Sequence, residues 1–389
     1  MPEIEPKPEI SNKEKERRYS LLRARLKNAG LSAIIVYGGS QLGVPVHYLT
    51  CIWGTRMNAL LFPVDGEPIF FIPNNSGQTP EKTAAQDCWI KVENIRLAAN
   101  QAVELAKAVI ELRLNNTKIG IDSYRWWPVF DQQTFLELCP GVQFIECHRL
   151  FGEIRGPKST EELALIRKAI QISDMAHHTF LANLRPGMTE EEAAKPAVDV
   201  LNSHDIGDRI ILIHSQPEAA YLNWPGPAII QKPNPVTFSP EFTRRKGYGA
   251  QMIRAYWWEP PKGVYKKMFE MWAEMRQMIV DEFRPGVEIT EAGKEIEKLI
   301  GKYGFECDKL GHAVGLSYGD APYITAGPEE KDYMEWTILE NEVYAVHPMC
   351  RCKGYVASYS MIGDMYLIAK DKTTRMTTAL SGLPEYIPQ

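Results

Sequence analysis

The chain has 389 residues, of which 44% are hydrophobic and 24% are charged, and its formal net charge is −5. This length predicts two domains, and the composition is that of an ordinary globular protein. The negative charge argues against a nucleic-acid-binding surface, and no apolar run approaches the roughly 18 residues of a membrane span. Seven cysteines without paired CxxC spacing argue against a disulfide scaffold, so we expect a reduced, cytoplasmic protein.

The first 150 or so residues alternate helices with short buried strands. Continuous apolar runs predict strands at residues 33–37, 59–63, 68–72, 118–122 and 143–147. Amphipathic spacing predicts helices at residues 14–29, 97–112 and 130–138. The alternation indicates an α/β domain, which we place at residues 1–153.

The second part of the chain contains an internal repeat. Ser159 and the glutamates that follow it predict the start of a long helix at residues 160–183. Residues 184–201, LRPGMTEEEAAKPAVDVL, then resemble residues 283–300, FRPGVEITEAGKEIEKLI. Two related halves predict a pseudo-symmetric domain with a site between them, and generic helix punctuation is the alternative explanation. Predicted strands near 210–214, 235–238, 248–256, 310–313, 342–347 and 365–368 favour an antiparallel sheet covered by helices.

Residues 309–322, KLGHAVGLSYGDAP, form a candidate functional site. Gly311 and Gly315 flank His312 and allow the backbone to approach a ligand closely. A histidine held there can exchange protons near neutral pH. A hydrogen-bonded structural histidine is the alternative.

Several ordered motifs resemble the creatinase/prolidase/aminopeptidase P superfamily. They are IRGPKSTEELALIRKA from residue 154, the repeated RPG turn, GYGAQMIR at 247–254, GHAVG at 311–315 and LENEVYAVHP at 339–348. Residues 47–62, HYLTCIWGTRMNALLF, resemble the creatinase-type N-terminal domain. The resemblance implies a homodimer with the pita-bread fold. Its α/β N-terminal domain would be followed, at residues 154–389, by an α+β domain with a pseudo-twofold antiparallel sheet covered by helices.

Metallopeptidases of this superfamily hold two divalent ions with two aspartates, one histidine and two glutamates. Residue by residue, these ligands fall on carboxylate-free residues 237–240, Gln251, His312, His347 and Gly363, which stands beside Asp364. Because carboxylates are needed to neutralise and bridge two ions, we expect no catalytic dimetal centre and no cofactor. A single divalent ion on His312, His347 and Asp364 is the alternative.

The resemblance makes creatinase-like, metal-free enzymes the nearest mechanistic relatives. Their catalytic histidine falls on Asn223, which cannot take a proton near pH 7. We therefore expect His312 and His347 to act as an acid–base pair that Asp364 orients. The expected substrate is a small molecule with a carboxylate, bound by Arg254 and, across the dimer, by Arg56. Further candidates for substrate contact are Tyr248, Tyr318, Asp320, Asn223, Gln251 and Trp224.

The favoured function is thus a metal-independent hydrolase that cleaves a C–N bond of a small anionic molecule. Three alternatives stay open: a lyase acting on a small carboxylate, a metal-dependent Xaa-Pro peptidase, and a non-catalytic pita-bread binding module. Neither a nucleic acid nor a membrane is expected as a partner.

Overall fold

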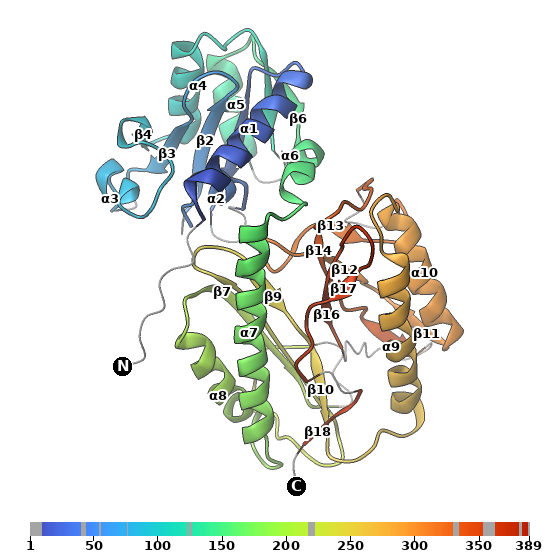
Figure 1. Ribbon diagram of the computed structural model, residues 1–389. Coiled ribbons are helices and arrows are strands. Elements are labelled where there is room, and N and C mark those ends of the chain that lie inside the picture. The colour runs from blue at the N-terminus through green and yellow to red at the C-terminus, as the bar shows by residue number, and fades with distance from the viewer. Residues whose placement is uncertain are drawn as a thin grey trace. The chain divides into compact units, whose positions relative to one another are not determined.

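The computed structural model describes residues 10–39, 44–53, 56–75, 77–122, 124, 127–216, 222–329, 334–352, 362–380 and 383–387. Their contacts divide the chain into two compact units, Met1–Arg155 and Gly156–Gln389 (Figure 1). The boundary that we set after residue 153 falls inside the last helix of unit 1. Each unit is described by itself.

Unit 1 is built on a six-stranded sheet with the order β4–β3–β2–β1–β5–β6. Strand β2 runs antiparallel to β1 and β3, and the other neighbours are parallel. The strands are β1 (Ala33–Gly38), β2 (Asn58–Pro63), β3 (Ile69–Pro73), β4 (Ile95–Ala98), β5 (Lys118–Ile121) and β6 (Gln143–Glu146). The helices are α1 (Asn12–Asn28), α2 (Val44–Thr50), α3 (Pro80–Ala84), α4 (Gln101–Glu111), α5 (Val129–Leu138) and α6 (His148–Arg155), with a short 3-10 turn, η2 (Val92–Asn94). The predicted α/β fold of this part is confirmed.

The apolar run of β1 predicted a buried strand correctly, whereas the end of β4 was predicted as part of a helix. All six residues of β1, AIIVYG, are buried, as a continuous apolar run in the interior of a sheet requires. The helix expected at residues 97–112 is wrong at its start, because residues 95–98 pair with β3 as a parallel strand. Helix α4 begins after Asn100, whose side chain accepts a hydrogen bond from the Val103 N–H and so caps the helix.

The first half of unit 2 opens with two capped helices, α7 (Thr160–Asn183) and α8 (Glu190–Asn202). The side chains of Ser159 and Thr189 each accept a hydrogen bond from the backbone N–H three residues on. The carboxylates of Glu162 and Glu192 in turn accept one from the N–H of the capping residue. The strands that follow are β7 (Ile206–His214), β8 (Val236–Arg244), β9 (Gly249–Gln251) and β10 (Arg254–Trp257). With β18 (Glu385–Tyr386) they form a sheet of order β18–β10–β8–β7, in which β9 also pairs with β8.

The second half repeats this plan with α9 (Gly263–Glu282) and α10 (Ile289–Lys302). Gly187 and Gly286, in the two RPG turns, have φ angles of 88° and 93°, a left-handed conformation that glycine adopts without strain. The remaining strands are β11 (Phe305–Cys307), β12 (Gly311–Ala313), β13 (Asp320–Ile324), β14 (Val343–Val346), β15 (Cys350–Cys352), β16 (Asp364–Leu367) and β17 (Thr374–Arg375). They form an antiparallel sheet of order β13–β12–β14–β16–β17, and β11 pairs separately with β15.

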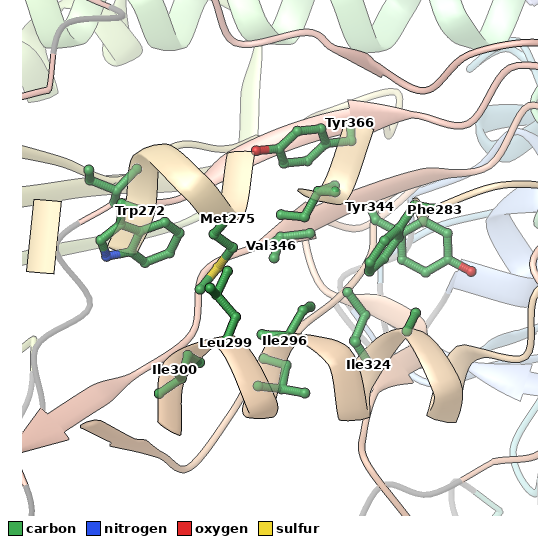
Figure 2. Packing of buried hydrophobic residues seen from close by; sticks show 14 of the residues in the cluster. Trp272, Met275, Phe283, Ile296, Leu299, Ile300, Ile324, Tyr344, Val346 and Tyr366 are labelled. Atoms are coloured by element: carbon green, nitrogen blue, oxygen red, sulfur yellow. The ribbon is translucent and has the colours of Figure 1, made fainter. Parts of the chain in front are cut away.

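Helices α9 and α10 pack on this second sheet, as Figure 1 shows within unit 2. Their buried side chains, among them Trp272, Met275 and Ile296, interdigitate with Val346 and Tyr366 of the sheet (Figure 2). Burying one such side chain contributes roughly 1.5–3 kcal/mol to folding. This core therefore fixes β12, which carries His312, and β14, which His347 directly follows.

In the described part of the chain, the two halves form separate sheets that meet at one isolated bridge. Ile253 and Gly363 exchange two backbone hydrogen bonds of 3.1 Å each. The pita-bread fold with mixed sheets covered by helices is nevertheless confirmed for unit 2.

Candidate functional site

A cavity of about 480 Å³ lies in unit 2, lined by residues from both of its sheets. Residues of β8 and β9 form one part of the lining, and residues of β12, β13 and the segment after β14 form another. Its polar lining includes Glu241, Gln251, His312, Tyr318, Thr325 and His347. Two halves of the internal repeat thus contribute to one hollow.

His312 and His347 converge in this cavity. Strand β12 pairs with β14 so closely that a Cβ atom on Gly311 would lie 2.2 Å from the Ala345 carbonyl oxygen, so only glycine fits there. His312 Nδ1 lies 3.0 Å from the Ala313 carbonyl oxygen and donates its proton to it, which leaves Nε2 with a lone pair. That Nε2 atom lies 3.0 Å from Nε2 of His347.

Both imidazoles are neutral at pH 7. Burial lowers the pKa of His312, and the Ala313 carbonyl and Asp320 oppose this only in part. Burial, followed by the neighbouring His312, lowers the pKa of His347 to about 3. Neutral imidazoles whose nitrogens face one another can share a proton or bind a metal ion between them.

Glu241 is the residue that sequence reasoning missed. It lies on β8 opposite Gln251 of β9, is 8% exposed, and accepts a hydrogen bond of 3.1 Å from Ser239 Oγ. Burial raises its pKa to about 7, although Ser239, Gln251 and Lys309 each oppose that rise. The available signal was weak: Glu241 stands one residue beyond the stretch 237–240 in which the resemblance placed a carboxylate.

The structure places Asp364 among arginines and not among the residues that line the cavity. Its carboxylate accepts hydrogen bonds from Arg254 Nη2 at 2.9 Å, Arg276 Nε at 2.8 Å and Thr377 Oγ1 at 2.7 Å. Burial alone would raise the pKa of Asp364, but the arginines outweigh burial and hold it below its usual range. The prediction that Asp364 orients a catalytic histidine is therefore corrected: this carboxylate neutralises buried guanidinium groups.

Neither predicted arginine lines the cavity. Arg254 is 1% exposed, and besides binding Asp364 its guanidinium donates to the carbonyl oxygens of Gly363 and Leu380, both at 2.9 Å. Those partners leave it no free edge for a substrate carboxylate. Arg56 belongs to unit 1, where it lines a separate hollow of about 340 Å³. Its role across a dimer stays a prediction.

Of the other candidates, Gln251 and Tyr318 line the cavity. Four do not, for separate reasons. Tyr248 is buried with its hydroxyl donating to Glu162 at 2.8 Å. Asp320 acts on His312 through its charge, and its carboxylate accepts a hydrogen bond from the Ala321 N–H.

Asn223 and Trp224 also fall outside the lining. The backbone of Asn223 forms an isolated bridge with Ile213, and the Trp224 side chain is 61% exposed. Residues 217–221, in the segment that leads to Asn223, lie outside the described part of the chain.

Comparison with known families decides the classification. The model for "Metallopeptidase family M24" matches residues 164–370, and that for "Creatinase/Prolidase N-terminal domain" matches residues 18–156. The chain belongs to metallopeptidase family M24. This M24 member is therefore a hydrolase of a peptidase family, and the predicted superfamily is confirmed.

Characterised relatives and solved structures agree with this classification. A probable dipeptidase PepE of Mycobacterium tuberculosis is 22% identical over 321 residues, 80% of this chain and 82% of the relative. The Xaa-Pro dipeptidase of Pyrococcus furiosus is 22% identical over 287 residues, 69% of this chain and 76% of the relative. Dipeptidase PepE from Mycobacterium ulcerans superimposes with a TM-score of 0.80 at 17% identity, covering 98% of this chain and 100% of that one. The prolidase from Pyrococcus horikoshii gives 0.75 at 18% identity, covering 93% and 98%.

Membership in M24 corrects our expectation that no cofactor is used. M24 is a family of metallopeptidases, and the relatives named above include Xaa-Pro dipeptidases. The metal-dependent peptidase, which we held as an alternative, fits these findings better than the metal-independent hydrolase that we favoured.

The described residues fit one ion better than two. They contain no group of three or more histidine, cysteine, aspartate or glutamate side chains gathered as for a metal ion. However, two nitrogens that bind one ion at about 2.1 Å with the right angle of octahedral coordination lie about 3.0 Å apart, and the two Nε2 atoms have that separation. The His312 Nδ1–H that donates to a backbone carbonyl is also the usual support of a metal-binding histidine. Separately, no described helix is long and apolar enough to cross a membrane.

Proposed function

We propose that this M24 member hydrolyses the amide bond of a small, dipeptide-like molecule in the cavity of unit 2. The observation that carries the proposal is the convergence of the His312 and His347 Nε2 atoms, 3.0 Å apart, on a cavity of about 480 Å³. A cavity of this volume accepts a molecule of dipeptide size. The names of the relatives, dipeptidase and Xaa-Pro dipeptidase, support the same bond.

His312 and His347 would hold a divalent ion through their Nε2 atoms. When bound, such an ion supplies Lewis-acid polarisation of the amide carbonyl and a more acidic water. The backbone keeps the His312 proton on Nδ1, so that Nε2 faces the cavity with its lone pair. In the 3.0 Å contact, His347 Nε2–H donates to the lone pair of His312 Nε2. Because burial holds both imidazoles neutral at pH 7, an ion would have to displace only this one proton.

Other residues of the cavity enclose the substrate. Tyr318 and Tyr323 line it, and the Tyr323 ring meets the edge of the His312 ring with centroids 5.9 Å apart. Aromatic walls of this kind exclude water and strengthen every electrostatic interaction inside.

The test is hydrolysis of dipeptides, Xaa-Pro and others, by the purified chain with manganese or cobalt added and with a chelator. We expect turnover with metal and its loss with chelator. His312→Ala and His347→Ala should each reduce turnover by more than about 100-fold, since losing even a residue that only supports a ligand costs about 10–100-fold. His178→Ala, an exposed histidine of α7, is the matched control and should keep its activity. Unchanged turnover in both cavity variants would defeat the proposal.

A further inference from the structure

Part of the cavity lining has more hydrogen-bond acceptors than the protein supplies with donors. We propose that Glu241 and Gln251 form a subsite for a primary ammonium group of the ligand. The inference rests on the proposed function in taking this cavity as the substrate site, and it goes further by naming the chemical group that Glu241 and Gln251 bind. It adds a cationic group to the carboxylate that we expected the substrate to carry.

Glu241 is a buried carboxylate that forms no ion pair within the described part of the chain. Its hydrogen bonds come from the neutral Ser239 hydroxyl and the Gln251 side chain. No lysine or arginine of the described residues forms an ion pair with it. Lys309, an exposed residue that also lines the cavity, acts on it through its charge without a salt bridge. A buried carboxylate in that position is destabilising unless a proton or a cation accompanies it. A ligand cation that enters the cavity would supply the missing charge.

Gln251 adds a second unsatisfied acceptor beside the first. It faces Glu241 across the β8–β9 pair and is 3% exposed, and its Oε1 atom has no hydrogen-bond partner. Thr325 Oγ1, elsewhere in the lining, is also buried without a partner. Unsatisfied buried polar atoms are rare in folded proteins and call for an explanation. A primary ammonium has three N–H donors and no acceptor, so it matches a carboxylate and an amide oxygen that lie side by side.

The charge of the subsite distinguishes an ammonium from other occupants. A single carboxylate balances one positive charge, whereas divalent ions in proteins are usually held by several oxygen ligands with more than one carboxylate. An anion would meet the Glu241 charge and the Gln251 oxygen directly, with repulsion from both. The raised pKa of Glu241 agrees with a carboxyl that lacks a counter-charge in the unliganded protein.

The experiment measures binding of an amine that has no bond to hydrolyse. Isobutylamine and isobutanol, which share an apolar body and differ in the charged group, are titrated into the full chain and followed by saturation-transfer NMR. We expect isobutylamine to bind at least tenfold more tightly than isobutanol. Glu241→Gln should remove that preference, and Gln251→Leu should weaken amine binding by a smaller factor.

The matched control is Glu295→Gln, which removes one carboxylate from the exposed face of α10 and should leave amine binding unchanged. A melting temperature within a few degrees of the wild type verifies that each variant is folded, and the Gln251 variant keeps the test valid if the Glu241 variant is not. Equal binding of amine and alcohol, or full amine affinity in Glu241→Gln, would overturn the subsite. So would manganese chloride alone binding to the wild type and losing its affinity in Glu241→Gln, because Glu241 would then be a metal ligand.

This result is independent of turnover. Amine binding that depends on Glu241, in a chain that cleaves no dipeptide, would retain the subsite and refute the proposed hydrolysis. Dipeptide turnover together with an amine affinity that is the same in wild type and Glu241→Gln would support the hydrolysis and refute the subsite.

Discussion

Two buried carboxylates in unit 2 have opposite surroundings. Asp364, 1% exposed, contacts Arg254, Arg276 and Thr377, and these partners hold its pKa below the usual range despite burial. Glu241, 8% exposed, has a serine and a glutamine as its partners, and burial raises its pKa to about 7. The first carboxylate is neutralised by the protein itself. The second lines a cavity and has no ion-pair partner among the described residues.

The difference shows that burial of a charged group does not identify a site. A buried acid surrounded by cations is part of the framework, because its interactions are complete within the chain. A buried acid with unfilled interactions that faces a cavity is a candidate for contact with a ligand. The following predictions test this distinction, in order of decreasing effect.

The largest effect is expected for Asp364→Asn. Removing this charge leaves Arg254 and Arg276 buried without their partner, and breaking a buried pair in this way costs about 3–5 kcal/mol. Urea unfolding followed by tryptophan fluorescence measures it. Glu241→Gln at pH 5 is the matched comparison and should change stability by less than about 1 kcal/mol, since it replaces a protonated carboxyl with a neutral amide. Similar losses of stability in Asp364→Asn and Glu241→Gln would contradict the distinction between a framework carboxylate and a ligand-binding one.

The second-largest effect is a pH dependence of folding stability that the Glu241 carboxyl causes. Its pKa in the folded chain, about 7, lies above the ordinary value of 4.5. The unfolded chain therefore loses this proton first as the pH rises, and folding stability falls between about pH 4.5 and 7 before it levels off. At about 1.4 kcal/mol per unit, the fall reaches about 3 kcal/mol.

The measurement is the difference in unfolding free energy between wild type and Glu241→Gln from pH 4.5 to 8, in which other titrating groups cancel. The unfolding free energy of Glu241→Gln, relative to that of the wild type, should increase as the pH rises. A difference that is flat, or that shrinks with pH, would show that the Glu241 carboxyl is charged in the folded chain throughout.

The smallest effect is expected for Ser239→Ala. The serine hydroxyl donates to Glu241 Oε1 at 3.1 Å, and losing one such bond costs about 1 kcal/mol. Because that bond favours the charged carboxylate, its loss should also extend the pH-dependent fall in stability to higher pH. Thr243→Ala, at a buried hydroxyl of the same strand that has no hydrogen-bond partner, is the control and should not move the pH profile.

The sequence predicted the fold better than it predicted the site. The α/β unit, the repeated helix pairs and the two capping boxes follow from local patterns, because each depends on residues a few positions apart. The placement of His312 and His347 in one cavity came from the family motifs. The strand β4 was missed because it is four residues long and precedes a helix of similar apolar spacing.

The two carboxylates were misjudged for a different reason. All nine residues of β8 are buried, so no alternation of polar and apolar residues reveals that Glu241 faces a cavity. Asp364 meets Arg254 across 110 positions of sequence, and such a pairing leaves no local pattern. Both errors concern which partners the fold brings to a side chain, and not which side chains are present.

Gly363 limits which substitutions the protein accepts beside His347. The superfamily resemblance puts a glutamate at that position, yet a Cβ atom there would lie 2.9 Å from Ile253 Cγ1 and 3.0 Å from the Cβ atom of His347. A glutamate at position 363 would fit only if Ile253 or His347 moved or changed with it. The present packing of these two side chains therefore depends on the glycine, and Gly363→Glu alone cannot add a carboxylate here without displacing one of them.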